Sequence, residues 1–215
     1  MSDTDSFIDE VTDEVRRDRL FAFFKRYGWI GVAAVVLIVG GAAYTEWQKA
    51  RDIAAAQEFG DAVMAAVETD VPGESLRAIA PSTGGHQAVV DFLIAADAVG
   101  ADDLVTAQKQ LKTIAEDTSL PNGLRQLAQL KLVILTGADM PVAERDAVLA
   151  ELAAPGAPYR LLAEEQQALA LVRDGKKDEA VALARQILRE ADLTDGLRRR
   201  ATELIVTLGA DPKAE

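Results

Sequence analysis

The chain has 215 residues, with 35 acidic against 23 basic side chains and a net charge of −12. An acidic surface repels phosphate backbones, so this balance argues against nucleic-acid binding. The absence of cysteine excludes disulfides, thiol catalysis and zinc–thiolate sites. Apolar residues make up 49% of the chain but aromatic residues only 5%, and much of the apolar share is alanine, a strong helix former. The composition therefore predicts an all-α protein.

Residues 1–26 mix acidic, basic and apolar side chains at helical spacing. Ser6 and Asp9 have the spacing of a capping box, and Val11 and Val15 stand one helical turn apart. This pattern is typical of a short amphipathic helix that lies on an anionic membrane surface. The alternative is a solvated tail that only sets the orientation of the segment that follows.

Residues 27–47 form the most apolar stretch. The 17 residues from Gly28 to Tyr44 carry no charge, and they would make about 26 Å of helix, near the lower limit for crossing a hydrocarbon core of about 30 Å. Aromatic side chains, which favour the two membrane–water interfaces, stand at both ends: Tyr27, Trp29, Tyr44 and Trp47. We predict a retained transmembrane helix. A cleaved signal peptide is the alternative, disfavoured by the long acidic segment ahead of the stretch and by the poor cleavage site in "GGAAYTEW".

The charges that flank this stretch predict its orientation. Five basic residues precede it closely, namely Arg16, Arg17, Arg19, Lys25 and Arg26, whereas only Lys49 and Arg51 follow it at a similar distance. Positive flanks stay in the cytoplasm, so the N-terminus is predicted inside and the residues after about position 47 outside.

One face of the predicted transmembrane helix carries small side chains. Gly31, Ala34, Gly41 and Thr45 fall at steps of 3, 7 and 4 residues. Small residues let another transmembrane helix approach closely, so this face is a candidate packing surface. The alternative is chance, since half of the residues from Gly28 to Ala43 are glycine or alanine.

Residues 48–215 are predicted to form one outer domain of short helices. Residues 48–69 continue helically with an apolar face, Ile53, Ala56, Phe59, Val63 and Val67, and are expected to end at Val71-Pro72-Gly73. Glycine and proline, among them Gly84-Gly85, Gly123 and Gly196, separate the later segments. The predicted helices lie near 74–80, 87–100, 103–117, 123–137, 142–154, 159–174, 177–191 and 195–209. No segment alternates with a two-residue period, so no strand is predicted.

The sequence repeats itself at a shift of 73 residues. "LPNGLRQLA" matches "LTDGLRRRA", and Ala107 and Ile114 align with Ala180 and Ile187. This period is close to two helical hairpins of about 34 residues each, the size of a tetratricopeptide repeat. The paired alanines are expected where neighbouring helices touch. The predicted fold is a single N-terminal transmembrane helix followed by a tetratricopeptide-like α-solenoid.

Several segments together resemble a known family, the YfgM-like single-span tetratricopeptide proteins of bacterial inner membranes. They are "DEVTDEVRRDRL", "FFKRYGWIGVAAVVLIVGGAAYTEW", "AAAQEFGDAVMAAV", and "GKKDEAVALARQIL" with "LTDGLRRRATELIVTLG". The resemblance implies a periplasmic accessory factor that associates with the Sec translocon and with periplasmic chaperones. The alternative is a structural accessory subunit built permanently into a larger inner-membrane complex, such as an energy-transducing one.

Few residues point to chemistry. His86 is the single histidine and lies in a flexible stretch without metal-ligand spacing, so a solvated loop histidine is favoured. Asp102-Asp103 and Glu164-Glu165 are expected at helix starts, where acids interact favourably with the macrodipole. No phosphate loop, nucleophile elbow or Ser/His/Asp set is present. We therefore predict no enzyme, no cofactor, no metal and no small-molecule substrate; the expected partners are proteins and the lipid bilayer.

Arg198-Arg199-Arg200 is the densest basic run in the outer domain. It could bind an acidic partner. A helix surface on which Arg199 pairs with Glu203 explains it more simply.

Overall fold

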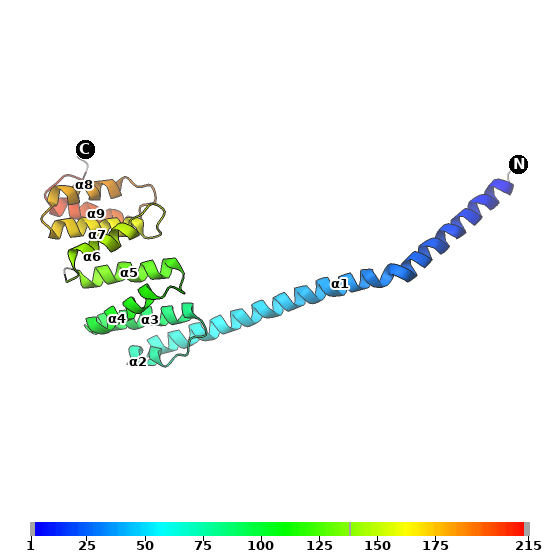
Figure 1. Cartoon of the computed structure of the whole chain (residues 1–215), viewed down its shortest axis with the longest axis horizontal. Coiled ribbons are helices and arrows are strands. Elements are labelled where there is room, and N and C mark those ends of the chain that lie inside the picture. The colour runs from blue at the N-terminus through cyan, green and yellow to red at the C-terminus, as the bar shows by residue number, and fades with distance from the viewer. Residues whose placement is uncertain (1–2, 138, 213–215) are drawn as a thin grey trace. The chain divides into compact units, whose positions relative to one another are not determined.

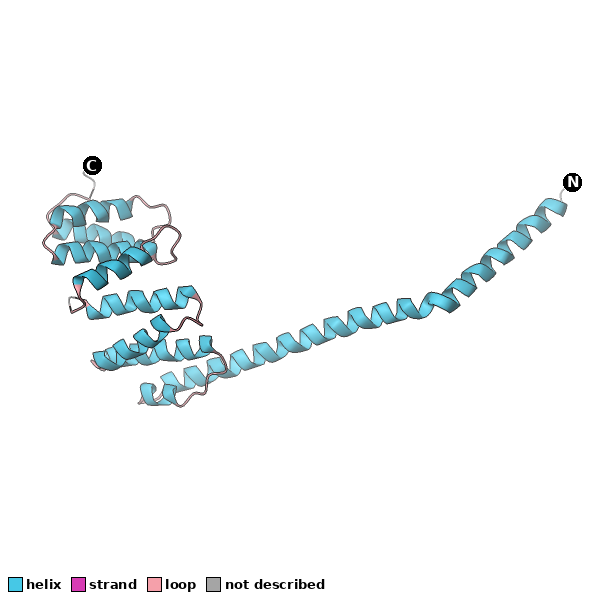
Figure 2. Ribbon diagram, viewed as in Figure 1, coloured by secondary structure: helices cyan, strands magenta, loops and turns pink. Residues whose placement is uncertain are grey.

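The computed structural model describes residues 3–137 and 139–212, with side chains from Lys25 onward except Tyr27 and Gly28. Within this range the chain forms helices and loops only, as Figures 1 and 2 show. The helices are α1 (Asp3–Val67), α2 (Pro72–Arg77), α3 (Gly84–Gly100), α4 (Leu104–Glu116), α5 (Asn122–Thr136), α6 (Val142–Leu152), α7 (Arg160–Arg173), α8 (Lys177–Leu188) and α9 (Asp195–Thr207). The all-α prediction is confirmed for this part of the chain.

The chain divides into two units, Met1–Gly60 and Asp61–Glu215. In the first unit, α1 exposes the described side chains of residues 29–58 except Ala33. Among the described residues, one helical stretch, Trp29–Val67, is long and apolar enough to cross a membrane by length and composition, and none of its apolar window is buried. It is the candidate membrane span of this protein.

Helix α1 ends earlier than expected. Its last residue is Val67, whereas the predicted break was Val71-Pro72-Gly73. Pro72 instead opens α2, because its fixed φ suits the first helical position and its missing N–H needs no partner there. Of the predicted apolar face, Phe59 and Val63 are half-buried, whereas Ile53, Ala56 and Val67 are exposed; Ala66, which lies outside that face, is buried.

Three glycine sites lie inside helices: Gly123 and Gly196 fall within the helices predicted at 123–137 and 195–209, whereas Gly84-Gly85 was expected ahead of the helix at 87–100. Gly84-Gly85, Gly123 and Gly196 fall in the first turns of α3, α5 and α9. Thr83 caps α3 by accepting the His86 N–H at 3.2 Å, and Thr194 caps α9 in the same way. A capping side chain satisfies free N–H groups of the first turn, so α3 can start at Gly84 and α9 just before Gly196.

The second unit is built from two equivalent copies, the first repeat (α2–α5) and the second repeat (α6–α9). The starts of α4 and α8, Leu104 and Lys177, lie 73 residues apart, and so do those of α5 and α9, Asn122 and Asp195. Within each copy, each helix packs against the next one along the chain (Figure 1). The 73-residue repeat is therefore confirmed in the starts of the third and fourth helices of each copy, whereas the starts of the first and second helices lie 70 and 76 residues apart.

The turn between the second and third helices of each repeat is closed by the same backbone hydrogen bonds. Asp102 and Gly175 both have positive φ, 59° and 76°. The Asp103 N–H donates to the Ala98 carbonyl at 2.8 Å, and its counterpart in the second repeat, the Lys176 N–H, donates to its own partner at 2.8 Å. This pattern is the Schellman closure of a helix end, which needs a left-handed residue.

The two repeats also bury equivalent side chains. The core of the first repeat contains Ala88, Ile114, Leu120 and Ala128. The residues 73 positions later, Leu161, Ile187, Leu193 and Ala201, form the core of the second repeat. Ala107 and Ala180 are each 0% exposed, as the repeat alignment predicts.

A separate cluster joins the two repeats. Leu130 and Val133 of α5 pack with Leu149 and Leu152 of α6 and with Ala163 of α7. All five are almost completely buried. Burying a large aliphatic side chain is worth about 1.5–3 kcal/mol, so this contact makes the two repeats one continuous stack.

Candidate protein-binding surface

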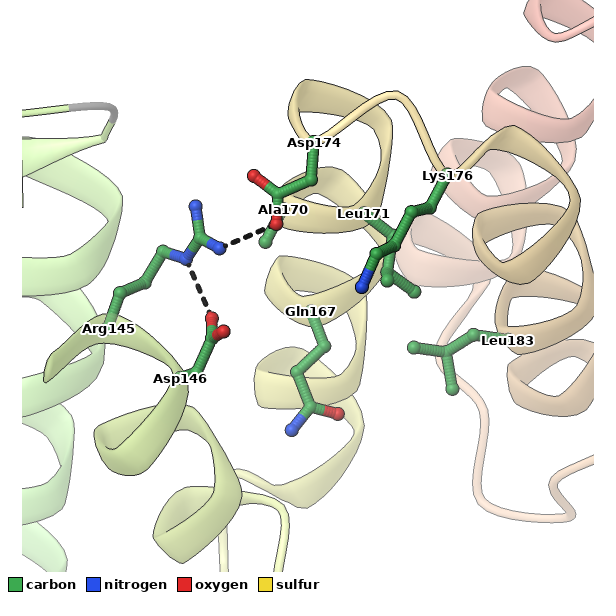
Figure 3. A pocket seen from close by; sticks show the side chains of 8 residues that line it. All are labelled: Arg145, Asp146, Gln167, Ala170, Leu171, Asp174, Lys176 and Leu183. Carbon is green, nitrogen blue, oxygen red and sulfur yellow. Dashed lines mark hydrogen bonds and ion pairs between the residues drawn. The ribbon is translucent and has the colours of Figure 1, made fainter. Parts of the chain in front are cut away.

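An open pocket of about 220 Å³ lies between α6, α7 and α8 of the second repeat (Figure 3). Its lining consists of Arg145, Asp146, Gln167, Ala170, Leu171, Asp174, Lys176 and Leu183. Apolar and charged side chains both face it. A pocket of this kind can accept a partner side chain that has an apolar stem and a polar end.

Arg145 is the charged centre of this pocket, and its side chain is 4% exposed. Its Nε donates to Asp146 Oδ1 at 2.9 Å and its Nη2 to Asp174 Oδ2 at 3.0 Å (Figure 3). Burial lowers the pKa of Arg145, but hydrogen bonds to the two carboxylates outweigh it and leave that pKa above its ordinary value. Arg145 therefore ties α6 to the end of α7. Nothing in the sequence marks it, because Asp174 lies 29 residues away.

Glu164 and Glu165 are buried in the second turn of α7, not at its start. Glu164 accepts from Arg160 at 2.7 Å, and Arg160 also binds Glu190 at 2.7 Å. Glu165 receives two hydrogen bonds from Arg200, at 2.6 and 2.7 Å. The macrodipole explanation is wrong for this pair, because an arginine partner compensates each buried carboxylate.

The basic run on α9 also differs from expectation. Arg200 makes the ion pair across to α7, while Arg198 and Arg199 are exposed. Among the described residues, no ion pair joins Arg199 to Glu203, so the pairing that we predicted there is wrong. The two exposed arginines leave a small basic surface on α9.

The expectation for Asp103 is confirmed, and that for His86 is wrong in part. Asp103 caps α4 by accepting the Thr106 N–H at 3.0 Å, and the hydrogen bonds from Thr106 lower the pKa of Asp103. His86 lies in the first turn of α3 and is half-buried, with Nδ1 3.0 Å from Ser82 Oγ. No group of three His, Cys, Asp or Glu side chains that could hold a metal is found in the described part of the chain.

Both repeats expose apolar side chains on their second helix. Leu162 and Leu169 of α7 are 36% and 37% exposed, and they stand seven residues apart, on one face of the helix. Val89 of α3, 73 residues before Leu162, is likewise exposed. Leu162 also lines a second open pocket, together with Tyr159. We name Val89, Leu162 and Leu169 the α3/α7 surface.

At the candidate membrane span, the structure brings together two predicted interface residues. The rings of Tyr44 and Trp47 lie 6.0 Å apart between centroids, and Arg51 Cζ lies 5.0 Å from the Trp47 ring centroid. Trp29 is exposed at the other end of the stretch. A cation over an exposed aromatic ring contributes about 0.5–1 kcal/mol.

The remaining predicted anchor residues divide into described and undescribed ones. Lys25 and Arg26 are exposed, whereas Tyr27, Arg16, Arg17 and Arg19 lie outside the described side chains. The predicted packing face of Gly31, Ala34, Gly41 and Thr45 is exposed. A Cβ added to Gly31 or Gly41 would meet nothing within 4 Å.

Two stacked copies of a four-helix repeat, in which each helix packs mainly on its neighbours along the chain, define a helical-repeat protein of the solenoid class. The chain matches the family described as a tetratricopeptide repeat-like domain over residues 22–197, and it belongs to that family. The match begins ahead of Trp29, so it includes the apolar stretch as well as the repeats. No curated protein and no solved structure matches the chain.

Proposed function

We propose that this protein is a membrane-anchored scaffold that binds other proteins through its repeats. Domains of the tetratricopeptide repeat-like family generally mediate protein–protein interactions and are not catalytic. The α3/α7 surface carries the proposal, because both repeats leave an apolar side chain exposed at the same position. Packing within a solenoid does not require such exposure, whereas partner binding uses it.

The anchor in this proposal is the transmembrane helix 27–47, retained in the mature protein. Its support is the uncharged length of the stretch and the aromatic residues at its ends, with Arg51 over Trp47 where the charged part of α1 begins. The basic flank ahead of it favours a cytoplasmic N-terminus and a periplasmic repeat domain in a bacterial inner membrane.

The proposed partners are the Sec translocon and periplasmic chaperones, as the resemblance to YfgM-like proteins implies. A fixed structural subunit of a larger membrane complex is the second candidate. Client binding predicts variable, sub-stoichiometric co-purification. A fixed subunit predicts a constant ratio to one complex through detergent extraction.

Single cysteines test the topology, since the chain has no native cysteine. Ser82→Cys should react with a membrane-impermeant thiol reagent added outside the inner membrane, and Ser6→Cys should not. The position of Ser82 is suitable because it is exposed, ahead of α3. Labelling of Ser6→Cys in sealed cells would reverse the proposed orientation.

Substitutions on the α3/α7 surface test the binding function. Leu162→Asp with Leu169→Asp should abolish photocrosslinks formed from the repeat domain in intact cells, with partners identified by mass spectrometry. Val206→Asp is the matched control, because Val206 is also exposed but lies on α9. Equal loss with the control, or no loss with the double variant, would contradict the assignment of this surface.

The small-residue face of the anchor is proposed as a second, lateral contact with the partner complex. Replacing Gly31 and Ala34 with leucine should fill the space that a neighbouring helix needs while keeping the protein in the membrane. Replacing Val32 and Val36 with leucine changes a different face. If both pairs of substitutions leave the recovery of the complex unchanged, the anchor acts only as a tether.

A further inference from the structure

Three apolar side chains are exposed within the seven residues 99–105, which include the turn between α3 and α4. Val99, Leu104 and Val105 are 46%, 40% and 79% exposed. The hydrogen bond from the Asp103 N–H to the Ala98 carbonyl, 2.8 Å long, holds the two helix ends together. Val99 and Leu104 directly follow these two bonded residues, so they flank the closure. We name Val99, Leu104 and Val105 the turn patch.

The second repeat shows that the fold does not need apolar residues at two of these three positions; the counterpart of Val99 is Val172. The same turn, with the same hydrogen bonds, carries Lys177 and Asp178 where the first repeat has Leu104 and Val105. Both charged residues are exposed, as expected for a turn in water. The first repeat therefore keeps exposed apolar side chains at positions where the same turn also accepts charged ones. Contiguous exposed apolar groups mark interaction sites.

The border of the turn patch is acidic. Asp102 and Asp103 precede Leu104 directly and are both exposed, and Asp103 is fixed as the cap of α4. Their counterparts in the second repeat are Gly175 and Lys176. The first repeat thus has two carboxylates at positions where the second has a glycine and a cation. The positive charge of Arg77 also helps to lower the pKa of Asp103.

We infer that the turn patch is a docking site for a partner protein segment that combines apolar side chains with flanking lysine or arginine. The apolar centre supplies the contact, and the two carboxylates select positive charge at its edge. An anionic lipid surface would be repelled by these carboxylates. A second copy of this chain would bring the same acidic border and its own net charge of −12. This site is separate from the α3/α7 surface and does not depend on that assignment.

The experiment uses the full chain in detergent micelles and three short fluorescent peptides of defined composition: leucine with lysine, leucine with glutamate, and serine with lysine. Fluorescence anisotropy measures binding. The leucine–lysine peptide should bind, and the other two should bind at least about tenfold more weakly, because each lacks one half of the recognition.

The matched variant grafts the second-repeat residues onto the first. Leu104→Lys with Val105→Asp leaves the net charge unchanged and places residues that the same turn already carries at Lys177 and Asp178. This variant should bind the leucine–lysine peptide at least about tenfold more weakly than the wild-type chain does. The reverse graft, Lys176→Asp with Lys177→Leu and Asp178→Val, should add a second binding site. Circular dichroism should show unchanged helix content in both.

Three results would overturn the inference. The first is an affinity that the Leu104→Lys, Val105→Asp variant does not change, and the second is equal weakening by Val206→Asp. The third is a wild-type dimer, seen by sedimentation, that the graft converts to monomer, because the occupant would then be a second copy. If the graft variant loses helix content, Val105→Asp alone replaces it, with the same expected and contrary results.

Discussion

The two repeats share the order of their helices and one turn but differ in the charges they bury. In the second repeat Arg160 binds Glu164 and Glu190. The residues 73 positions earlier are Gln87, Asp91 and Asp117, and there Gln87 Nε2 donates to Asp91 Oδ1 at 2.8 Å without a cation. Backbone closure and apolar core are thus kept in both copies, whereas the polar side chains around them vary.

The repeats also differ in the burial of one face of their last helix, α5 in the first repeat and α9 in the second. In the first repeat Leu130 and Val133 of α5 are buried against α6 and α7. The counterparts on α9 are Glu203 and Val206, both exposed. Equivalent positions on α5 and α9 therefore have different surroundings: on α5 they are covered by the next two helices, and on α9 they face solvent.

The largest expected effect comes from exchanging these two residues. Leu130→Glu should lower the free energy of unfolding of the full chain by more than about 3 kcal/mol, because it buries a carboxylate without a partner. Glu203→Leu should change it by less than about 0.5 kcal/mol. Urea unfolding followed by circular dichroism measures both. Similar losses in the two variants would contradict the difference in burial between positions 130 and 203.

Enlarging the buried alanines should have the next largest effect. Ala107→Leu and Ala180→Leu each overpack a position that is 0% exposed, and each should cost about 1–3 kcal/mol. Ala182→Leu, two residues further along α8 and exposed, is the control and should be nearly neutral. The Tm of the full chain in micelles tests this. An equal loss in Ala182→Leu would show that the buried face of α8 is not the one that contains Ala180.

Exchanging the left-handed turn residues should have a smaller effect. Gly175→Asp should cost about 0.5–1 kcal/mol, because a side chain disfavours the positive φ of 76° at this position. Asp102→Gly should give a gain of the same order or smaller, since glycine also increases the freedom of the unfolded chain. The urea midpoints of the two variants measure both effects. A stabilised Gly175→Asp or a destabilised Asp102→Gly would show that the positive φ does not set the preference for glycine at these positions.

The smallest effect concerns pH. Burial raises the pKa of Asp91, and the hydrogen bond from Gln87 only partly opposes this. A raised pKa means that the contribution of Asp91 to stability is greatest below its unfolded-state pKa and is lost as pH rises through its folded-state pKa. Asp91→Asn should therefore stabilise the chain, relative to wild type, more at about pH 7 than at about pH 4. If the difference in stability between Asp91→Asn and wild type does not change with pH, the pKa of Asp91 is not raised.

Gln87→Arg sharpens the same prediction. It recreates the arrangement of Arg160 with Glu164 and supplies the missing cation beside Asp91. The added charge should lower the pKa of Asp91 and shift the loss of stability with pH to lower pH. Titration of the Tm against pH measures the shift, and Gln129→Arg, on α5, serves as the control.

Local sequence by itself determined the helices and the repeat. Glycine and proline positions, together with the absence of any two-residue alternation, placed α3 to α9 within a few residues of their observed ends. The 73-residue shift aligned Ala107 with Ala180 before their burial was visible. The apolar stretch ahead of the repeats followed from composition alone. These features depend on residues a few positions apart, or on a copy of the same pattern.

Tertiary structure alone decided which charges are buried. Arg145 meets Asp174 over 29 residues and Arg200 meets Glu165 over 35. Periodicity carries no information about such pairs, because a buried arginine and an exposed one obey the same helical spacing. Only the tertiary fold buries Arg145 and Glu165 and places a group of opposite charge from another helix or helix end beside each. Interhelical contact is also what buried Glu164 and Glu165, which local reasoning had placed at an exposed helix start.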